Sequence, residues 1–335
     1  MRPPPRWARR VLLAPGVLLL TVLVLVTLPG WLVVAAAVSP LLPGKFRALR
    51  VLWVAVVALV LESTVLVVLY WYWLLSGFGA ALRTPLFQRL HYQLIGWYLD
   101  VLYREVVRVL RLRIEIEGPH PDEYLNRPLV VCSRHAGPGD SFMLVHALVN
   151  WYAREPRIVL AEQLQWDPAL DVVLNRLPNR FIRGGGAALE RRISELAHAL
   201  DHDDAFLIFP EGGNFTERRR LAAIERLRGR GLEDMARRSE AMRHVLAPRP
   251  GGLTAALAAA PEADVVWVAH AGLDQLYTLA DVWRELPLDQ TVRMRWWRVP
   301  VAEVPRTEEE QVEWLYQWWE RIDAWIDEVR REEAG

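Results

Sequence analysis

Cysteine is almost absent from this sequence: Cys132 is the only one among 335 residues. A lone cysteine cannot form a disulfide within the chain, which fits a reducing compartment. Cys132 falls in an apolar, β-rich run, so we expect a buried and unreactive thiol rather than a nucleophile. The sequence therefore excludes a fold held together by internal disulfides.

An excess of charge of either sign is also absent. The chain has 40 basic and 40 acidic side chains, and its formal net charge is zero. Nucleic-acid-binding proteins usually carry a basic excess, so we expect no nucleic-acid partner. The chain is rich instead in apolar residues, at 53%, and in tryptophan, with sixteen. Tryptophan is favoured at membrane interfaces, where one edge of the ring is apolar and the other is wet.

Charged side chains are missing from residues 11–42, and residues 51–82 contain only Glu62. An apolar helix needs roughly 20 residues to cross a bilayer, and both runs are longer. Core helices of soluble proteins seldom run so far without charge, and a signal peptide is shorter and has no second run after it. We therefore expect two membrane-spanning helices that form an anchor over residues 1–82.

The basic residues around this anchor indicate its orientation. Arginines stand before residue 11 and after residue 82, which favours both ends on the cytoplasmic side of the membrane. The short connection around Lys45 is also basic, which argues the other way. Pro29 and Gly30 interrupt the first run and allow a re-entrant hairpin there. We prefer two crossings, with the following globular domain on the cytoplasmic side.

Residues 83–112 alternate apolar and basic side chains. An apolar stripe recurs at helical spacing from Leu86 through Trp97 to Val101, while Arg89 and Arg104 lie elsewhere on the cylinder. This pattern predicts an amphipathic connecting helix. A helix on the bilayer surface and a helix packed on the globular domain fit it equally well.

Short β-rich runs alternate with helical stretches from residue 113 onward. Such alternation predicts an α/β fold with a mainly parallel central sheet flanked by helices, which we place at residues 113–305. The predicted strands are residues 113–117, 129–133, 157–161, 180–183, 205–209, 265–269 and 291–295. The predicted helices between them include residues 142–152, 187–200 and 216–230.

Residues 306–335 are predicted to form a C-terminal, tryptophan-rich helix. Thr307 followed by Glu310 is a capping box, which marks the start of the helix. An apolar stripe then runs from Trp314 to Val329 at helical spacing. Such a stripe more often packs than binds a cofactor, so we expect it to dock onto the core or onto the membrane surface.

His135 and Asp140 follow the predicted strand at residues 129–133. Reactive groups of open α/β sheets gather at the carboxyl ends of strands. The small residues between the two allow Asp140 to fold back toward His135. A neutral imidazole can accept the proton of an alcohol that attacks a thioester, and a carboxylate on its other nitrogen fixes the tautomer. By spacing alone, the commoner case is an aspartate that merely caps the next helix.

Three further blocks follow in order, and they support the catalytic interpretation. Together the four resemble the motifs of the glycerophosphate and lysophosphatidate acyltransferase family, whose members include 1-acyl-sn-glycerol-3-phosphate acyltransferases. The resemblance covers about residues 84–300, and a segment at 244–252 is similar to one in the lysocardiolipin-type branch. The four blocks are His135 with Asp140, residues 180–184, the Phe-Pro-Glu-Gly at 209–212, and the hydrophobic strand at 265–269.

The resemblance implies roles for individual residues. His135 would be the general base and Asp140 its partner. Arg183 would bind the acceptor phosphate together with the backbone of Gly184 and the two glycines after it. A guanidinium offers phosphate a planar fork, and consecutive backbone N–H groups form an anion nest. The plainer alternatives are a surface ion pair for Arg183 and a flexible turn for the glycines.

The third block would place Glu211 and Gly212 beside the acceptor. Glu211 would hold the glycerol hydroxyl or order a phosphate-binding arginine; its plainer role is a salt bridge at a strand end. The family usually continues this block with Thr and Arg, but Gly213 and Asn214 stand here. A phosphate-binding arginine is therefore missing at Asn214. The candidates to replace it are Arg218, Arg219, Arg220 and Arg249.

The first block departs from the family as well. The family often has Asn before the catalytic His and Ser within the loop, and here Arg134 and Gly137 stand in these places. His198 and His202 have a metal-like spacing, but no third ligand is evident, so we expect a solvated helix end and no metal.

The resemblance thus implies a membrane-bound O-acyltransferase of phospholipid biosynthesis or remodelling. It would move a fatty acyl group from acyl-CoA or acyl carrier protein, as co-substrate, to the free hydroxyl of lysophosphatidic acid or a related lysophospholipid. No cofactor is expected, and the partners are membrane lipids and the acyl donor. The alternatives are a membrane lipid hydrolase using the same His and Asp, although no Gly-x-Ser-x-Gly elbow occurs, and a non-catalytic membrane scaffold.

Overall fold

Two compact units make up the chain in the computed structural model, which describes residues 2–42, 44, 46–120, 123, 126–184, 186–272, 283, 286 and 288–334. The first, which we call the helical unit, comprises residues 1–113, 160–183 and 278–290. The second, the sheet unit, comprises residues 114–159, 184–277 and 291–335.

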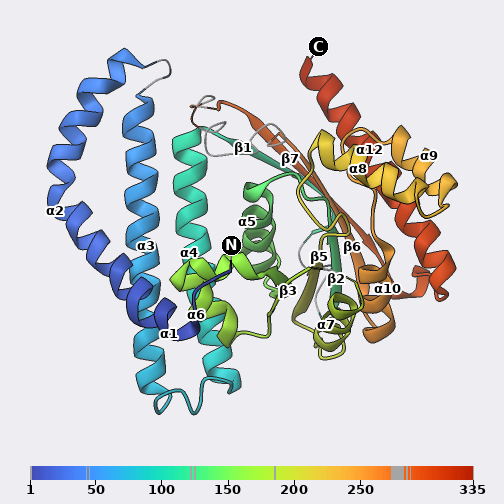
Figure 1. Ribbon diagram of the computed structural model, residues 1–335, viewed down its shortest axis with the longest axis horizontal. Coiled ribbons are helices and arrows are strands. Elements are labelled where there is room, and N and C mark those ends of the chain that lie inside the picture. The colour runs from blue at the N-terminus through green and yellow to red at the C-terminus, as the bar shows by residue number, and fades with distance from the viewer. Residues whose placement is uncertain are drawn as a thin grey trace. The chain divides into compact units, whose positions relative to one another are not determined.

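Long apolar helices dominate the helical unit, where α2, α3 and α4 lie side by side (Figure 1). Two helical stretches, Arg6–Leu41 and Arg47–Leu75, are long and apolar enough to cross a membrane. Side chains such as Leu19 and Val26 are more than 70% exposed. The helix continues through Pro29 without a break, so no re-entrant hairpin forms there. Its described helices include α1 (Arg6–Ala8), η1 (Arg9–Leu13), α2 (Ala14–Val38), η2 (Ser39–Leu41), α3 (Arg47–Leu75), α4 (Pro85–Leu110), η5 (Glu162–Trp166) and α6 (Pro168–Arg176).

The predicted amphipathic helix is α4, which packs against α3. Its buried face includes Leu94 and Leu99, but Leu86 and Trp97 of the predicted stripe are exposed. Helix α6, from the middle of the sequence, joins this packing through Val172. Helix α6 contributes its own apolar face to this cluster, so which side of α4 is buried depends on α6 and could not be predicted from the sequence of α4 alone.

In the described part of the chain, seven strands form one sheet with the order β1-β7-β6-β2-β5-β3-β4. Strand β2 pairs in parallel with β5 and β6, β3 pairs in parallel with β5, and β7 is antiparallel to β6. Strands β2, β5 and β6 are buried along their whole length, as is typical of parallel strands covered on both faces. The predicted α/β fold is confirmed. The strands are β1 (Arg113–Glu117), β2 (Leu129–Ser133), β3 (Glu155–Ala161), β4 (Arg180–Ile182), β5 (Asp204–Ile208), β6 (Asp264–Ala271) and β7 (Thr291–Val299).

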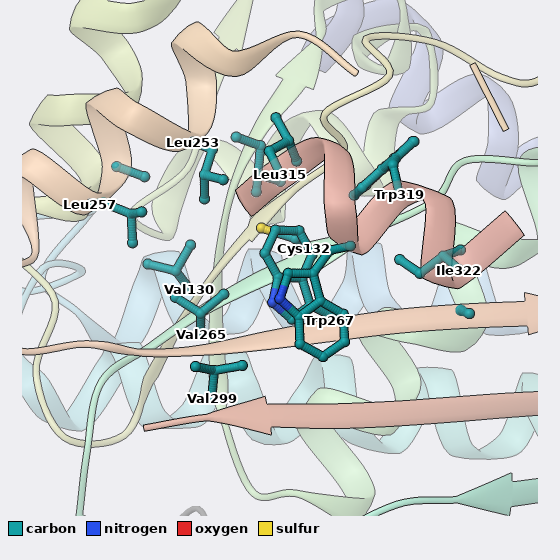
Figure 2. Packing of buried hydrophobic residues seen from close by; sticks show 14 of the residues in the cluster. Val130, Cys132, Leu253, Leu257, Val265, Trp267, Val299, Leu315, Trp319 and Ile322 are labelled. Atoms are coloured by element: carbon teal, nitrogen blue, oxygen red, sulfur yellow. The ribbon is translucent and has the colours of Figure 1, made fainter. Parts of the chain in front are cut away.

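Helices α7, α10 and α12 cover one face of the sheet, where Val130 and Cys132 of β2 point (Figure 2). The Cys132 side chain is fully buried, and burial raises the pKa of its thiol far above the usual range. The inert core cysteine that the sequence predicted is therefore confirmed. The helices of the sheet unit include α5 (Pro138–His146), η4 (Ala147–Trp151), α7 (Ala187–Ala197), α8 (Glu217–Arg228), α9 (Glu233–Ala241), α10 (Pro250–Ala259), η6 (Val301–Glu303) and α12 (Glu308–Ala334).

The C-terminal helix α12 packs its tryptophan stripe on the core. Trp318, Trp325 and Val329 are buried in the same cluster as Trp267 of β6, and the Trp267 and Trp318 rings stack with centroids 5.3 Å apart. The predicted capping box also forms, because the Glu310 N–H donates to Thr307 Oγ1 at 3.3 Å and the Thr307 N–H to Glu310 Oε2 at 3.3 Å. Of the two expected docking surfaces, the stripe uses the core.

Candidate active site

Three neighbouring parallel strands bring reactive side chains to one edge of the sheet. In the strand register, Ser133 at the end of β2 pairs with Val268 of β6, and Cys132 pairs with Ile208 of β5. The residues that follow these pairs therefore meet at the carboxyl edge. His135 follows the end of β2, and Glu211 follows the end of β5. His270 is the second-to-last residue of β6.

His135 and Asp140 are in contact. The His135 Nδ1 lies 3.1 Å from each carboxylate oxygen of Asp140. The Asp140 side chain is 2% exposed and that of His135 is 19% exposed. Since an ionised carboxylate can only accept, Nδ1 must carry the proton, which leaves the lone pair on Nε2. Among the described residues none hydrogen-bonds Nε2, so this nitrogen is available to a substrate.

Backbone donors hold Asp140 in place. The N–H groups of Ala136 and Gly137 donate to its Oδ2 at 2.6 and 3.1 Å, and the Ser141 hydroxyl donates to its Oδ1 at 3.2 Å. Burial by itself raises the pKa of Asp140, but hydrogen bonds and charge from His135 and His270 outweigh it and hold the pKa well below its usual range. Asp140 thus caps the N-terminus of helix α5 and pairs with His135 at the same time. The two roles considered from the sequence, a helix cap and a partner of His135, therefore occur together.

The position of His135 is also fixed by ring stacking and by a backbone hydrogen bond. Its ring stacks on Phe209, the residue after β5, with centroids 4.5 Å apart. Its carbonyl accepts the Phe215 N–H at 2.6 Å. Because ring face, Nδ1 and backbone are all held, Nε2 has one direction in which to point. Such preorganisation is what a general base requires.

A second histidine, which the sequence reasoning missed, lies against Asp140. The His270 Nε2 is 3.5 Å from Asp140 Oδ2 and 3.4 Å from the carbonyl oxygen of Arg134. His270 is 4% exposed. The available signal was its place directly after the run at 265–269 that resembles the fourth motif, because the parallel pairing of β2 and β6 puts that strand end beside the His135 loop.

Arg134 stands where the resemblance described above predicts an asparagine, and its side chain has a structural role. Its side chain is fully buried, and it donates to the carbonyl oxygens of His270 at 2.7 Å and His244 at 2.9 Å. The arginine therefore ties the His135 loop to the end of β6 and to the loop before α10. A guanidinium can span these two carbonyls, which is beyond the reach of the shorter asparagine side chain.

Glu211 is buried directly behind the His135 loop. Its exposed fraction is 2%, and its Oε2 accepts the His135 backbone N–H at 3.4 Å. Burial raises the pKa of Glu211 to about 8, although the charge of Arg134 and backbone N–H groups lower it in part. Near neutral pH its carboxyl group is thus largely protonated and is able to donate a hydrogen bond into the site.

We expect the substitution Glu211→Gln to stabilise the protein increasingly as the pH rises from 5 to 8. The pKa of Glu211 is about 8 in the folded state and near its ordinary value of 4.5 in the unfolded state, so unfolding releases a proton across this window. The wild type is then progressively destabilised above pH 4.5, whereas the amide does not titrate. The melting temperature difference between variant and wild type should grow with pH in detergent solution.

Glu225→Gln, at an exposed position on α8, provides the control for this titration. Its melting temperature difference from the wild type should stay constant over the same pH range. A constant difference for Glu211→Gln as well would mean that Glu211 is ionised throughout, in conflict with the buried neutral carboxyl group inferred above.

Gly212 and Arg249 lie next to Glu211 in the same unit. Gly212 has φ +67°, and a Cβ there would come within 3.0 Å of the Arg249 Nη1. The glycine therefore allows the Arg249 guanidinium to lie flat over the backbone beside Glu211. The Arg249 N–H donates to the Pro210 carbonyl at 2.8 Å, which fixes the loop before α10 to the end of β5.

Arg183 and Gly184 fall at the boundary between the two units. Arg183 belongs to the helical unit, where its Nη2 donates to Glu162 Oε1 at 2.8 Å. Gly184 has φ +72° and belongs to the sheet unit, and Gly185 lies outside the described residues. The ion pair with Glu162 is the plainer role considered for Arg183, and its binding of phosphate stays a prediction.

His198 and His202, the two histidines with metal-like spacing, lie in the segment at the end of α7 and before β5. The His202 Nε2 lies 3.3 Å from Asp203 Oδ2, and both side chains are 61% exposed. In the described part of the chain, no group of three or more His, Cys, Asp and Glu side chains is placed to hold a metal ion. His202 and Asp203 are exposed residues of the segment between α7 and β5.

Comparison with known proteins identifies the sheet-containing region. The Acyltransferase family model matches residues 113–267, which include His135, Asp140 and Glu211 but end before His270. No curated protein sequence matches the chain significantly. The crystal structure of the 1-acyl-sn-glycerophosphate (LPA) acyltransferase PlsC from Thermotoga maritima is similar, with 16% identity and a TM-score of 0.46 over 79% of this chain and 95% of that one. Residues 113–267 of this chain are thus similar to the Acyltransferase family.

Proposed function

We propose that this protein is a membrane-bound enzyme that transfers a fatty acyl group from acyl-CoA or acyl carrier protein to the free hydroxyl of lysophosphatidic acid or a related lysophospholipid. One observation carries this proposal. The Asp140 carboxylate is buried and held by backbone N–H groups, it accepts the Nδ1 proton of His135, and it leaves Nε2 free. That arrangement suits deprotonation of an alcohol.

The mechanism is a direct transfer with balanced bonds. His135 Nε2 takes the proton of the acceptor hydroxyl while the oxygen attacks the thioester carbonyl. The imidazolium is stabilised by Asp140, whose pKa lies well below its usual range and keeps it ionised. When the tetrahedral intermediate collapses, the carbon–sulfur bond breaks and the thiolate takes the proton from Nε2. The products are the acylated lipid and the free thiol, and His135 returns to its neutral form.

The remaining binding roles follow from the positions of the side chains. A neutral Glu211 is suited to hold the acceptor's glycerol oxygen beside His135, since its protonated carboxyl group can donate. Gly212 opens space for Arg249, a cation next to that carboxyl group. Arg183 and Gly184 are proposed to contact the acceptor phosphate, in which case Arg183 exchanges its surface ion pair with Glu162 for the phosphate.

Membrane attachment is proposed through the helical unit. The two apolar helices are long enough to span a bilayer, and the exposed side chains of α2 are almost all aliphatic or aromatic. Arg6, Arg9 and Arg10 before the first span favour a cytoplasmic N-terminus and, with two crossings, a cytoplasmic catalytic domain. A lysophospholipid acceptor and a membrane anchor fit together, because the anchor keeps the enzyme at the surface where its substrate resides.

Product analysis tests this function. Membranes containing the protein are incubated with mixed lysolipids and labelled acyl-CoA or acyl carrier protein, and the products are identified by mass spectrometry. We expect labelled diacyl phospholipid. Free fatty acid alone, in the presence of acceptor, would show a hydrolase, and no turnover with intact lipid binding would show a scaffold. In sealed inverted vesicles, a cytoplasmic domain is active before detergent is added; activity seen only after detergent would reverse the orientation.

A further inference from the structure

A groove of about 640 Å³ begins at Glu211 and Gly212 and continues along helix α8. This volume lies within the usual range of about 300–1,000 Å³ for small-molecule sites. Its walls combine apolar side chains, among them Leu227, Met235 and Tyr316, with several arginines. All of its lining residues belong to the sheet unit. The groove therefore starts beside the acid that contacts the His135 backbone.

Four arginines line this groove: Arg219, Arg226, Arg230 and Arg249. Arg219 is engaged, since its Nη1 donates to the Asn214 carbonyl at 3.0 Å. No described residue accepts a hydrogen bond from, or forms an ion pair with, the guanidinium groups of the other three. This distinguishes them from Arg220 and Arg228 of helix α8, which pair with Glu217 and Glu240.

Arg226 and Arg230 lie close enough to Arg249 for their charges to act on it. Burial first, and then the charges of Arg226 and Arg230, lower the pKa of Arg249. Three cations that repel one another without an internal counterion form a local positive potential, which an anion relieves. Two carboxylates, Glu190 and Glu308, also line the groove. They lie at its Gly251 end, where both also line a neighbouring cavity, and neither forms an ion pair with an arginine of the cluster.

We propose that Arg226, Arg230 and Arg249 form the site that binds the phosphate group of a substrate in this enzyme. This inference rests on the proposed acyl transfer to a lysophospholipid. It also answers which arginine replaces the one missing at Asn214: Arg218 does not line the groove, Arg219 and Arg220 are engaged elsewhere, and Arg249 lies over Gly212. Guanidinium groups suit this task because they donate to phosphate through a planar fork.

Two substrates carry phosphate, the lysophospholipid acceptor and coenzyme A, and kinetics distinguishes them. The double substitution Arg226→Gln with Arg230→Gln removes two cations and keeps hydrogen-bonding side chains. We expect the KM for one substrate to rise by roughly ten-fold or more, because hydrogen bonds to charged groups are worth about an order of magnitude in affinity each, while kcat changes little. A rise for the lysolipid alone identifies the acceptor phosphate, and a rise for acyl-CoA alone identifies the donor.

Arg218→Gln is the matched control, since Arg218 is an exposed arginine of the same helix α8 outside the groove. It should leave both KM values unchanged. An equal rise in the control would show a general charge effect on membrane or substrate attraction and would overturn the proposal. Unchanged KM values in the double variant would overturn it as well.

A binding measurement separates this proposal from the acyltransferase function itself. Isothermal titration calorimetry with the full-length protein carrying His135→Ala uses glycerol 3-phosphate and adenosine 3′,5′-bisphosphate as probes. We expect one probe to bind, and to lose roughly ten-fold or more in affinity when Arg226 and Arg230 are also replaced. If the wild type transfers no acyl group but the probe still binds through these arginines, the function fails and the site stands. Equal affinity in both proteins refutes the site.

Discussion

Replacing His135 by alanine is expected to lower the rate of acyl transfer by about 10²–10⁴-fold or more, the usual contribution of a general base. The expectation follows from the geometry of Nε2. It is the free nitrogen of a ring whose Nδ1 is bound to Asp140 at 3.1 Å and whose face stacks on Phe209. The loss should appear in kcat, because the imidazole acts on the proton during the reaction rather than on the bound substrate. Steady-state kinetics with labelled acyl-CoA measures it.

The fold of this variant should survive. Asp140 keeps the backbone donors of Ala136 and Gly137 and the contact of His270 when the imidazole is removed. His202→Ala, at an exposed histidine of the same unit, is the control and should retain full activity. Purified His135→Ala with wild-type acylation rates would show that this imidazole is not the base.

Asp140→Asn provides an independent view of the same pair. Asparagine keeps the volume of aspartate but places an NH₂ group among N–H donors, which the backbone of Ala136 and Gly137 supplies. The amide also cannot stabilise an imidazolium or enforce the Nδ1–H tautomer, so we expect a loss on the order of 10²-fold or more in kcat. A loss confined to KM would assign Asp140 to shaping the loop alone.

The second large effect concerns stability. We expect Trp267→Ala to lower the free energy of unfolding of the sheet unit by about 3–5 kcal/mol. Trp267 is fully buried in β6 and its ring contacts those of Trp314, Trp318 and Trp319 at centroid distances of 5.0, 5.3 and 6.0 Å. Its removal opens a cavity between the sheet and α12. At roughly 2–4 °C per kcal/mol for a domain of this size, the melting temperature should fall by about 10 °C.

Trp267→Phe separates cavity formation from loss of the indole N–H. Among the described residues the buried Trp267 Nε1 has no hydrogen-bond partner, so losing this N–H costs nothing. The phenyl ring retains part of the stacking, and we expect a clearly smaller loss than for alanine. Trp166→Ala, at a side chain 43% exposed, controls for tryptophan removal in general. Equal destabilisation by all three variants in thermal melts would show that α12 does not depend on this contact.

Strands and their order along the chain were predictable because their signals are local. The β-rich runs at 113–117 and 129–133 match β1 and β2 to the residue, and the others match within a few residues. A buried parallel strand must be apolar along its whole length, so its sequence shows it. The start of α12 was predictable for a similar reason, since Thr307 and Glu310 satisfy backbone groups only three residues apart.

The reactive pair was also predictable in part, because His135 and Asp140 are close in sequence. The four residues between them are small or turn-forming, and short loops leave few ways to arrange their ends. The sequence could not predict that Asp140 caps α5 and binds His135 at the same time. The same carboxylate oxygens serve both contacts, and only the backbone path of residues 135–140 decides whether both are possible.

What the sequence alone determined is therefore the α/β class, the two long apolar helices and a histidine and aspartate at a strand end. Only the tertiary structure decided which distant residues join them. His270 reaches Asp140 because β6 pairs with β2, and Arg249 lies over Gly212 because its loop is bound to Pro210. The unpaired Arg226, Arg230 and Arg249 line the same groove for an equally non-local reason. Local signals set secondary structure, whereas the contacts that assemble a site depend on pairings between segments far apart in the chain, which hydrophobic patterns do not encode.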